Sequence, residues 1–243
     1  MEQKNVNRKK KGFSVFTLKI VATILLMLQI IVPAIAQSAY AGDIRDNFSV
    51  LSIVVVSQII SWAAVPMYAW MLVEGIKHTE HIGLYALRLA VLAIICEIPY
   101  DYATSQTWFN WRSQNPVFGL LIALITVIIL RKYKRNLLVS VIAIIAGLLW
   151  NLFGFVGVMQ GVMYTGVLTF AMVLIFWFLY DKENTKMITA GLLGAMFFIA
   201  PGVGVAVLHY VRDEEPIKSQ SLRRMFYVLY PVILISGMII ALL

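Results

Sequence analysis

Eight long apolar segments dominate the chain, and they restrict its fold more than any other feature. A helix needs roughly 20 apolar residues to cross a bilayer, and short polar or charged stretches separate the segments. The segments are residues 16–36, 50–73, 84–98, 117–130, 137–155, 162–180, 187–208 and 225–243. They predict an all-α, polytopic membrane helix bundle of about eight transmembrane helices. Residues 1–243 then form a single integral membrane domain.

Composition supports the same class. Hydrophobic residues make up 61% of the chain and charged residues only 13%, whereas a soluble domain is about 25% charged. The net charge of +8 comes from basic residues in the turns between segments. This placement is typical of contact with a lipid bilayer and not with nucleic acid. Cys96 is the single cysteine, so the chain has no internal disulfide.

The basic residues also predict an orientation. If the basic segment 1–14 is cytoplasmic, fourteen of the 20 lysines and arginines lie on the cytoplasmic side. Eight spans would then return the end of the chain to the cytoplasm. The basic turn 212–224 disagrees, because this arrangement places it outside. For the first segment, the alternative is a signal peptide with Ala39-Tyr40-Ala41 as its cleavage box.

The third and fourth segments are too short for straight spans, and the loop between them, 99–116, is rich in Trp, Asn, Gln and Tyr. Short helices around polar backbone are tolerated only where they are buried in protein or line a cavity. The loop is therefore a candidate site. An aromatic belt at the membrane interface, formed by Tyr102, Trp108 and Trp111, is an equally good interpretation.

Glu74 and His78 are four residues apart where the second segment meets water. On a helix they share one face, and a helix that continued to His81 would add a second imidazole. A carboxylate beside an imidazole orients it and raises its basicity, as a general base requires. The spacing alone favours a solvated helix end. Two ligands are too few for a metal, so no metal site is expected.

Glu97 and Asp101 flank Pro99 at the far end of the third segment. Pro99 is expected to end the helix, so the two carboxylates need not share a face. Glu97 lies at the apolar boundary and needs a partner from another helix. Arg88 is too far along the same helix to be that partner. These features favour a functional role for Glu97.

Gln114 and Asn115 precede Pro116 at the start of the fourth segment. Their amide groups offer donors and acceptors for a polar ligand. Asn followed by Pro is also typical of an N-cap and a first helical position. The two roles are compatible.

In this order, the motifs of the chain resemble those of the TraX family of bacterial membrane proteins. The founding member of that family is associated with N-terminal acetylation of a conjugative pilin, and the family is allied to the type 3 membrane acyltransferases. The matching stretches are Leu18-Lys19-Ile20, Pro66, Leu72-Val73-Glu74-Gly75, His78-Thr79, Tyr85, Arg88-Leu89, Glu97-Ile98-Pro99-Tyr100-Asp101, Phe109-Asn110, Gln114-Asn115, Phe118, Phe226-Tyr227 and Tyr230-Pro231. The resemblance implies a multi-pass protein of the bacterial cytoplasmic membrane.

The chain departs from the family where the resemblance expects catalytic histidines. The first span of the family usually carries an Asp-His pair, but this chain has Gln29-Ile30. An isoleucine cannot take or give a proton. A second histidine, after the Tyr-Pro of the last span, is replaced within Val232-Ile233-Leu234. The imidazole that still matches the family is His78.

The resemblance implies a membrane acyltransferase. It would transfer an acyl group from acyl-CoA, with acetyl-CoA as the expected donor, to an amine or hydroxyl of a peptide, lipid or glycan acceptor. His78 and Glu74 are the expected catalytic residues on the cytoplasmic side, with Glu97 and Asp101 expected on the opposite side. The substrate-binding candidates are Arg88, Glu97, Asp101, Gln114 and Asn115.

The alternative is a non-catalytic relative that keeps the fold and acts as a binding, accessory or immunity membrane protein. The replacement of both expected histidines favours this interpretation, and the retained polar residues at membrane depth disfavour it. A small transporter has little support, because no inverted repeat is visible in the sequence.

Overall fold

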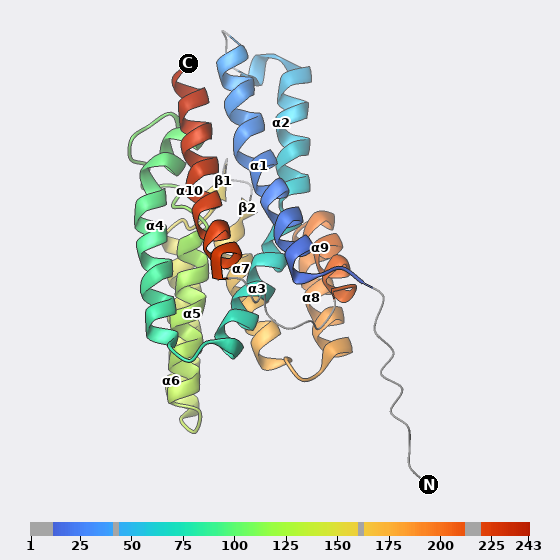
Figure 1. Cartoon of the computed structure of the whole chain (residues 1–243), viewed down its shortest axis with the longest axis vertical. Coiled ribbons are helices and arrows are strands. Elements are labelled where there is room, and N and C mark those ends of the chain that lie inside the picture. Colours follow the sequence, from blue (N-terminus) through green and yellow to red (C-terminus); the bar gives the residue numbers. More distant parts are fainter. Residues whose placement is uncertain (1–11, 41–43, 160–162, 212–219) are drawn as a thin grey trace.

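The computed structural model describes residues 12–40, 44–159, 163–211 and 220–243. Most of the predicted basic segment 1–14 therefore lies outside the described residues. The elements in chain order are α1 (Val15–Ala39), η1 (Ile44–Asp46), α2 (Phe48–Ser61), α3 (Ala64–His78), α4 (Ile82–Ser105), α5 (Val117–Lys132), α6 (Leu137–Phe153), β1 (Val158–Met159), β2 (Met163–Tyr164), α7 (Thr165–Phe178), α8 (Glu183–Phe197), α9 (Ile199–His209) and α10 (Gln220–Leu242). Figure 1 shows the helices side by side in an elongated bundle.

The described part confirms an all-α membrane bundle. Its two strands have two residues each and pair with each other in antiparallel orientation. Three helical stretches are long and apolar enough to cross a membrane: α1, the continuous region Phe48–His78 that holds α2 and α3, and α4. Shorter apolar helices include α6, α7 and α9. Large aliphatic side chains such as Ile53 and Ile94 are exposed on the helices, as lipid-facing surfaces require.

The helix α7 lies at the centre of the bundle, where it packs against α3, α5, α6 and α8. Leu168, Met172 and Phe176 on α7 are fully buried. Their burial fixes the end of α7 against α3. The turn that follows α7 is thereby placed next to the last turns of α3.

The predicted single segment 187–208 is wrong, because the structure divides it into α8 and α9. The backbone at Phe198 is extended (φ −163°, ψ 158°), and the two helices pack against each other. Gly194 permits this contact, since an added Cβ would lie 2.9 Å from the backbone nitrogen of Gly202. The apolar run is thus a helical hairpin.

This hairpin changes the relative placement of the last elements. The backbone N–H of Phe13, just before α1, donates to the carbonyl of Tyr210, just after α9, at 2.9 Å. In the later half of α10, an added Cβ at Gly237 would meet Ile30 of α1 and Ala103 of α4. α10 therefore runs parallel to α1 and α4, and its last residues lie at the opposite end of the bundle from Phe13 (Figure 1).

Two expectations are corrected by this arrangement. Tyr210 and Val211, which precede the basic residues 212–224 in the chain, lie beside Phe13, so α9 ends on the side where α1 begins and not on the opposite side. The end of α10 does not return to the side on which α1 begins. The physical reason is that α8 and α9 form a helical hairpin. The beginning of α8 and the end of α9 therefore lie at the same end of this hairpin.

Pro99 does not end its helix, contrary to the prediction. α4 continues through it to Ser105 and has 24 residues, long enough to span. A proline inside a helix removes one backbone hydrogen bond, which membrane helices tolerate when neighbouring groups compensate. Glu97 and Asp101 are consequently one helical turn apart on the same face.

Candidate functional site

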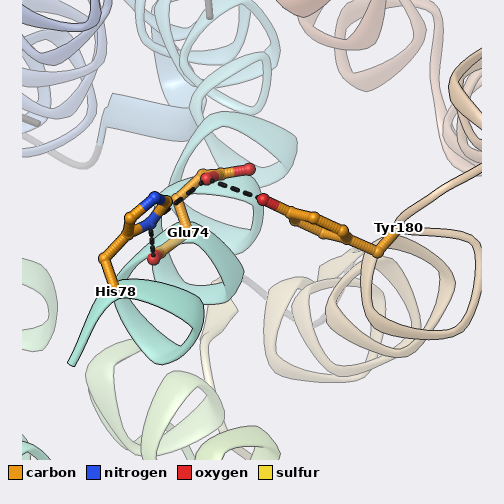
Figure 2. Close-up of polar contacts among 3 residues, drawn as sticks. All are labelled: Glu74, His78 and Tyr180. Carbon is orange, nitrogen blue, oxygen red and sulfur yellow. Dashed lines mark hydrogen bonds and ion pairs between the residues drawn. The ribbon is translucent and has the colours of Figure 1, made fainter. Parts of the chain in front are cut away.

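Glu74 and His78 lie on the last two turns of α3, and Tyr180 approaches them from the turn after α7. Figure 2 shows the three side chains together. The hydroxyl of Tyr180 donates to Oε2 of Glu74 at 3.2 Å. The same carboxylate oxygen lies 3.6 Å from Nδ1 of His78. The arrangement is a row of tyrosine, carboxylate and imidazole at the end of the helix.

The tautomer of His78 follows from a second contact. Nδ1 lies 2.8 Å from the backbone carbonyl oxygen of Glu74, and a carbonyl can only accept, so Nδ1 carries the hydrogen. The lone pair of the neutral ring is then on Nε2. The side chain of His78 is 52% exposed and that of Glu74 is 25% exposed. The imidazole can therefore reach a substrate while its carboxylate partner stays partly shielded.

His81 does not extend this row. α3 ends at His78, Thr79 is extended, and His81 stands at the start of α4 without a side-chain capping bond. The helix that would have aligned the three side chains thus stops at His78.

Tyr180 is the residue of this group that sequence reasoning missed. It lies 106 residues from Glu74 in the chain, and in the sequence its turn resembles an ordinary aromatic position at a membrane interface. The spacing of nearby residues cannot predict a contact over such a distance along the chain. The signal that was present is Trp177 and Tyr180 beside charged residues at the end of an apolar segment.

Arg88 lies on the same half of α4 as the turn after His78, and its side chain is exposed. It interacts electrostatically with Tyr227 of α10, whose hydroxyl is hydrogen-bonded to Tyr85. The structure therefore connects Arg88 to α10. It does not place Arg88 in contact with the carboxylate of Glu74 or the ring of His78.

Glu97, Asp101 and Asn115 meet at the other end of α4. Oε2 of Glu97 accepts from the backbone nitrogen of Asn115 at 3.1 Å and from its side-chain Nδ2 at 2.7 Å. Oδ2 of Asp101 accepts from the backbone nitrogen of Asn110 at 2.8 Å. The other oxygen of Asp101, Oδ1, is buried and has no hydrogen-bond partner in the described part of the chain. These contacts fasten the loop 106–116 to α4.

The two amide residues have different environments. Nδ2 of Asn115 also donates to the carbonyl of Ala93, and Oδ1 accepts from the backbone of Val117, so its side chain joins α4 to the start of α5. The backbone of Gln114 pairs with that of Phe155 and Gly157. Asn115 is thus fully engaged by the protein, whereas the Gln114 side chain is partly exposed.

The sequence-predicted residues therefore fall into two groups, not one. From Ile82 to Glu97 the helix α4 rises by about 22 Å at 1.5 Å per residue. Glu74 and His78 lie near the first end, whereas Glu97, Asp101 and the two amides lie near the second (Figure 1). In the described ranges, no cluster of three or more His, Cys, Asp or Glu side chains could hold a metal ion.

The positions where the resemblance expects histidines lie together in an apolar cluster. Ile30 of α1 and Ile233 and Leu234 of α10 are buried, and they pack with Cys96 and Tyr100 of α4. The three helices meet closely, since an added Cβ at Gly237 would lie 2.5 Å from Ile30. In this chain the cluster is a hydrophobic contact between helices.

Comparison with known proteins gives one family. The model of that family, described as TraX protein, matches residues 14–241, nearly the whole chain. Searches of curated proteins and of solved structures found no significant match.

Proposed function

Because the chain belongs to the TraX family, we propose that it is a membrane acyltransferase. It would move an acyl group, acetyl in the simplest case, from acyl-CoA to an amine or hydroxyl of a peptide, lipid or glycan acceptor. The observation that carries the proposal is the bond from Nδ1 of His78 to the carbonyl of Glu74. This bond directs the free lone pair of an exposed imidazole away from the helix, which is what a general base needs.

The chemistry assigns a role to each group. Nε2 of His78 takes the proton of the acceptor as the acceptor attacks the thioester carbonyl. A new bond from nitrogen or oxygen to carbon forms, the bond from carbon to sulfur breaks, and the proton passes to the leaving thiolate. The carboxylate of Glu74, 3.6 Å from Nδ1, stabilises the imidazolium that exists between these steps.

Acyl transfer also needs a donor that stabilises the developing oxyanion. Among the substrate-binding candidates, Gln114 and Asn115 carry amide donors, but they lie at the far end of α4 from His78. Arg88 is the candidate with donor groups in the same half of the bundle. We therefore propose Arg88 as the oxyanion or phosphate partner.

The proposed orientation places His78 at the cytoplasmic face of a bacterial cytoplasmic membrane, where acyl-CoA is available. The end of the bundle that holds His78 also carries the turns after α5 and α7 with their lysines and arginines. An excess of basic residues at one end supports a cytoplasmic position for it.

Glu97 and Asp101 would then face the opposite side of the membrane. We propose that they, with Asn115, hold the loop 106–116 in place as the surface that meets the acceptor. The support is their bonding to the backbone of that loop. A reaction that joins the two ends would have to bring the acceptor to His78 through the protein.

A second candidate is a non-catalytic TraX-fold relative that binds a partner. The apolar packing of Ile30 against Ile233 and Leu234 favours it, because these apolar residues occupy both positions where the family resemblance expects a histidine. The row of Glu74, His78 and Tyr180 weighs against it, since packing alone requires no such contact.

Labelled acetyl-CoA separates the two candidates. The purified chain, reconstituted in lipid vesicles, is incubated with acetyl-labelled and with CoA-labelled donor and with peptide, lipid and glycan acceptors. The enzyme proposal expects acetyl label, but not CoA label, on one class of acceptor. Absence of both transfer and CoA binding would leave the non-catalytic candidate.

A further inference from the structure

Two lysines from different helices converge on the ring of Tyr180. Nζ of Lys77, in the last turn of α3, lies 4.2 Å from the centre of the Tyr180 ring and 4.7 Å from that of Trp177. Nζ of Lys186, in the first turns of α8, lies 5.3 Å from the centre of the Tyr180 ring. Three segments of the chain thus bring two positive charges and two aromatic rings together.

In the part of the chain that the structure describes, no salt bridge pairs a carboxylate with Lys77 or Lys186. Lys186 is only 8% exposed, and its ammonium donates to the carbonyl of Tyr180 at 3.4 Å. A buried cation without a counter-charge is costly, and cation–π contacts offset only part of that cost. The pair is therefore suited to an anion.

We propose that Lys77 and Lys186, with Trp177 and Tyr180 between them, form a binding site for the phosphate groups of a phosphorylated ligand. The identity of the ligand rests on the proposed function: it is the phosphorylated ADP portion of acyl-CoA, whose phosphates pair with the ammonium groups and whose adenine can stack on an aromatic face.

The location of the site agrees with this role. The hydroxyl of Tyr180 bonds to Glu74, and Glu74 contacts His78 (Figure 2). The carboxylate of Glu74 is the acidic group at the edge of the site, and it meets the hydroxyl of Tyr180. A ligand held over the ring would thus have its phosphates beside the row and its acyl end free to reach the imidazole.

A purely structural role makes a different prediction. Lysines near helix C-terminal ends bond to free carbonyls and interact well with the helix dipole. Lys186 bonds to a carbonyl just after α7, and Lys77 lies in the last turn of α3. In that case, replacing either lysine lowers stability and leaves the affinity for phosphate ligands unchanged.

Equilibrium binding to the full chain distinguishes the two roles. The protein in nanodiscs of zwitterionic phosphatidylcholine is titrated with CoA and with adenosine 3′,5′-bisphosphate by calorimetry. Lys77→Met and Lys186→Met should each weaken both affinities about tenfold, while Lys186→Arg retains most of the binding. The matched control is Lys134→Met in the basic turn after α5, which lines an open cavity of about 580 Å³. It should leave binding within about twofold.

An equal loss in Lys134→Met, or no loss in the other two variants, overturns the site. If Lys186→Met does not fold, Lys77→Met decides on the same criterion, and Lys186→Arg should still retain most of the binding. A lipid phosphate is the other source of this chemistry, and it is tested with anionic phosphatidylglycerol in the nanodiscs. If phosphatidylglycerol weakens CoA binding to the wild type but not to Lys77→Met, the site binds phosphate groups and lipid can occupy it. CoA binding without acyl transfer contradicts the proposed function and not this site.

Discussion

The hydroxyl of Tyr180 donates a hydrogen bond to the carboxylate of Glu74 at 3.2 Å, across 106 residues of chain. The contact exists because α7 packs against α3, so the turn after α7 arrives beside the last turns of α3. Glu74 is thereby held between a tyrosine and the imidazole of His78. A carboxylate fixed from both sides keeps its position relative to the imidazole as the proton moves.

Tyr180→Phe removes only the hydroxyl, and it should lower the rate of acyl transfer several-fold with little change in KM for acyl-CoA. If Tyr180 acts through Glu74, Tyr180→Phe should lower the rate of acyl transfer much less in a Glu74→Gln background than in the wild type. Initial rates of the four proteins form the double-mutant cycle. Tyr133→Phe, in the turn after α5, is the control. Equal effects of Tyr180→Phe in both backgrounds would show that the tyrosine acts independently of Glu74.

Asn115→Ala should destabilise the protein by about 2–3 kcal/mol, because it leaves buried backbone groups without their partners. Glu97→Ala should have a similar effect, since Oε2 accepts twice from Asn115. Glu97→Gln keeps an acceptor oxygen in place and should cost less. Thermal unfolding in detergent measures all three. A loss as large in Glu97→Gln as in Glu97→Ala would mean that the charge, and not the hydrogen bonding, holds the loop.

Gly204 lets α9 approach the break between α2 and α3, since an added Cβ would collide with the carbonyl of Ala63 and lie 2.7 Å from Pro66. Gly204→Ala should therefore lower stability by about 1–3 kcal/mol through overpacking. Gly83 has open space around its Cβ position, so Gly83→Ala should be neutral or stabilising. Thermal unfolding of the two variants gives the comparison. Equal stability of both would contradict the close packing of α9 against Ala63 and Pro66.

Tyr210→Cys and Phe48→Cys should be labelled from opposite sides of the membrane. Both side chains are exposed, and Tyr210 lies beside Phe13 whereas Phe48 begins α2 at the other end. Cys96 is buried and should remain unlabelled. A membrane-impermeant maleimide, added to intact cells and to inverted vesicles, measures the side. Labelling of Tyr210→Cys in intact cells would contradict a cytoplasmic position for the end that holds His78.

Local patterns predicted much of the bundle. Apolar length located α1, α5 and α6 within a few residues, because hydropathy responds to each span separately. The pairing of Glu74 with His78 follows from their helical spacing, and the structure shows the two side chains in contact.

Features that depend on packing between helices could not be predicted from local sequence patterns. Residues on both sides of Phe198 are apolar, so hydropathy cannot distinguish a helical hairpin from one span. The hairpin depends on glycines such as Gly194 that let two helices touch. The contact of Tyr180 with Glu74 likewise depends on how α7 lies against α3. Pro99 within α4 was mispredicted because a local breaker was compensated by the surrounding bundle.

The rate of acyl transfer by His78→Ala tests whether His78 is the general base. We expect a loss of about 100-fold or more in kcat, as removal of a general base causes, with CoA binding retained. His209→Ala, at the exposed end of α9, should transfer at the wild-type rate. A folded His78→Ala protein that transfers acyl groups as fast as the wild type would contradict the assignment of His78 as the base.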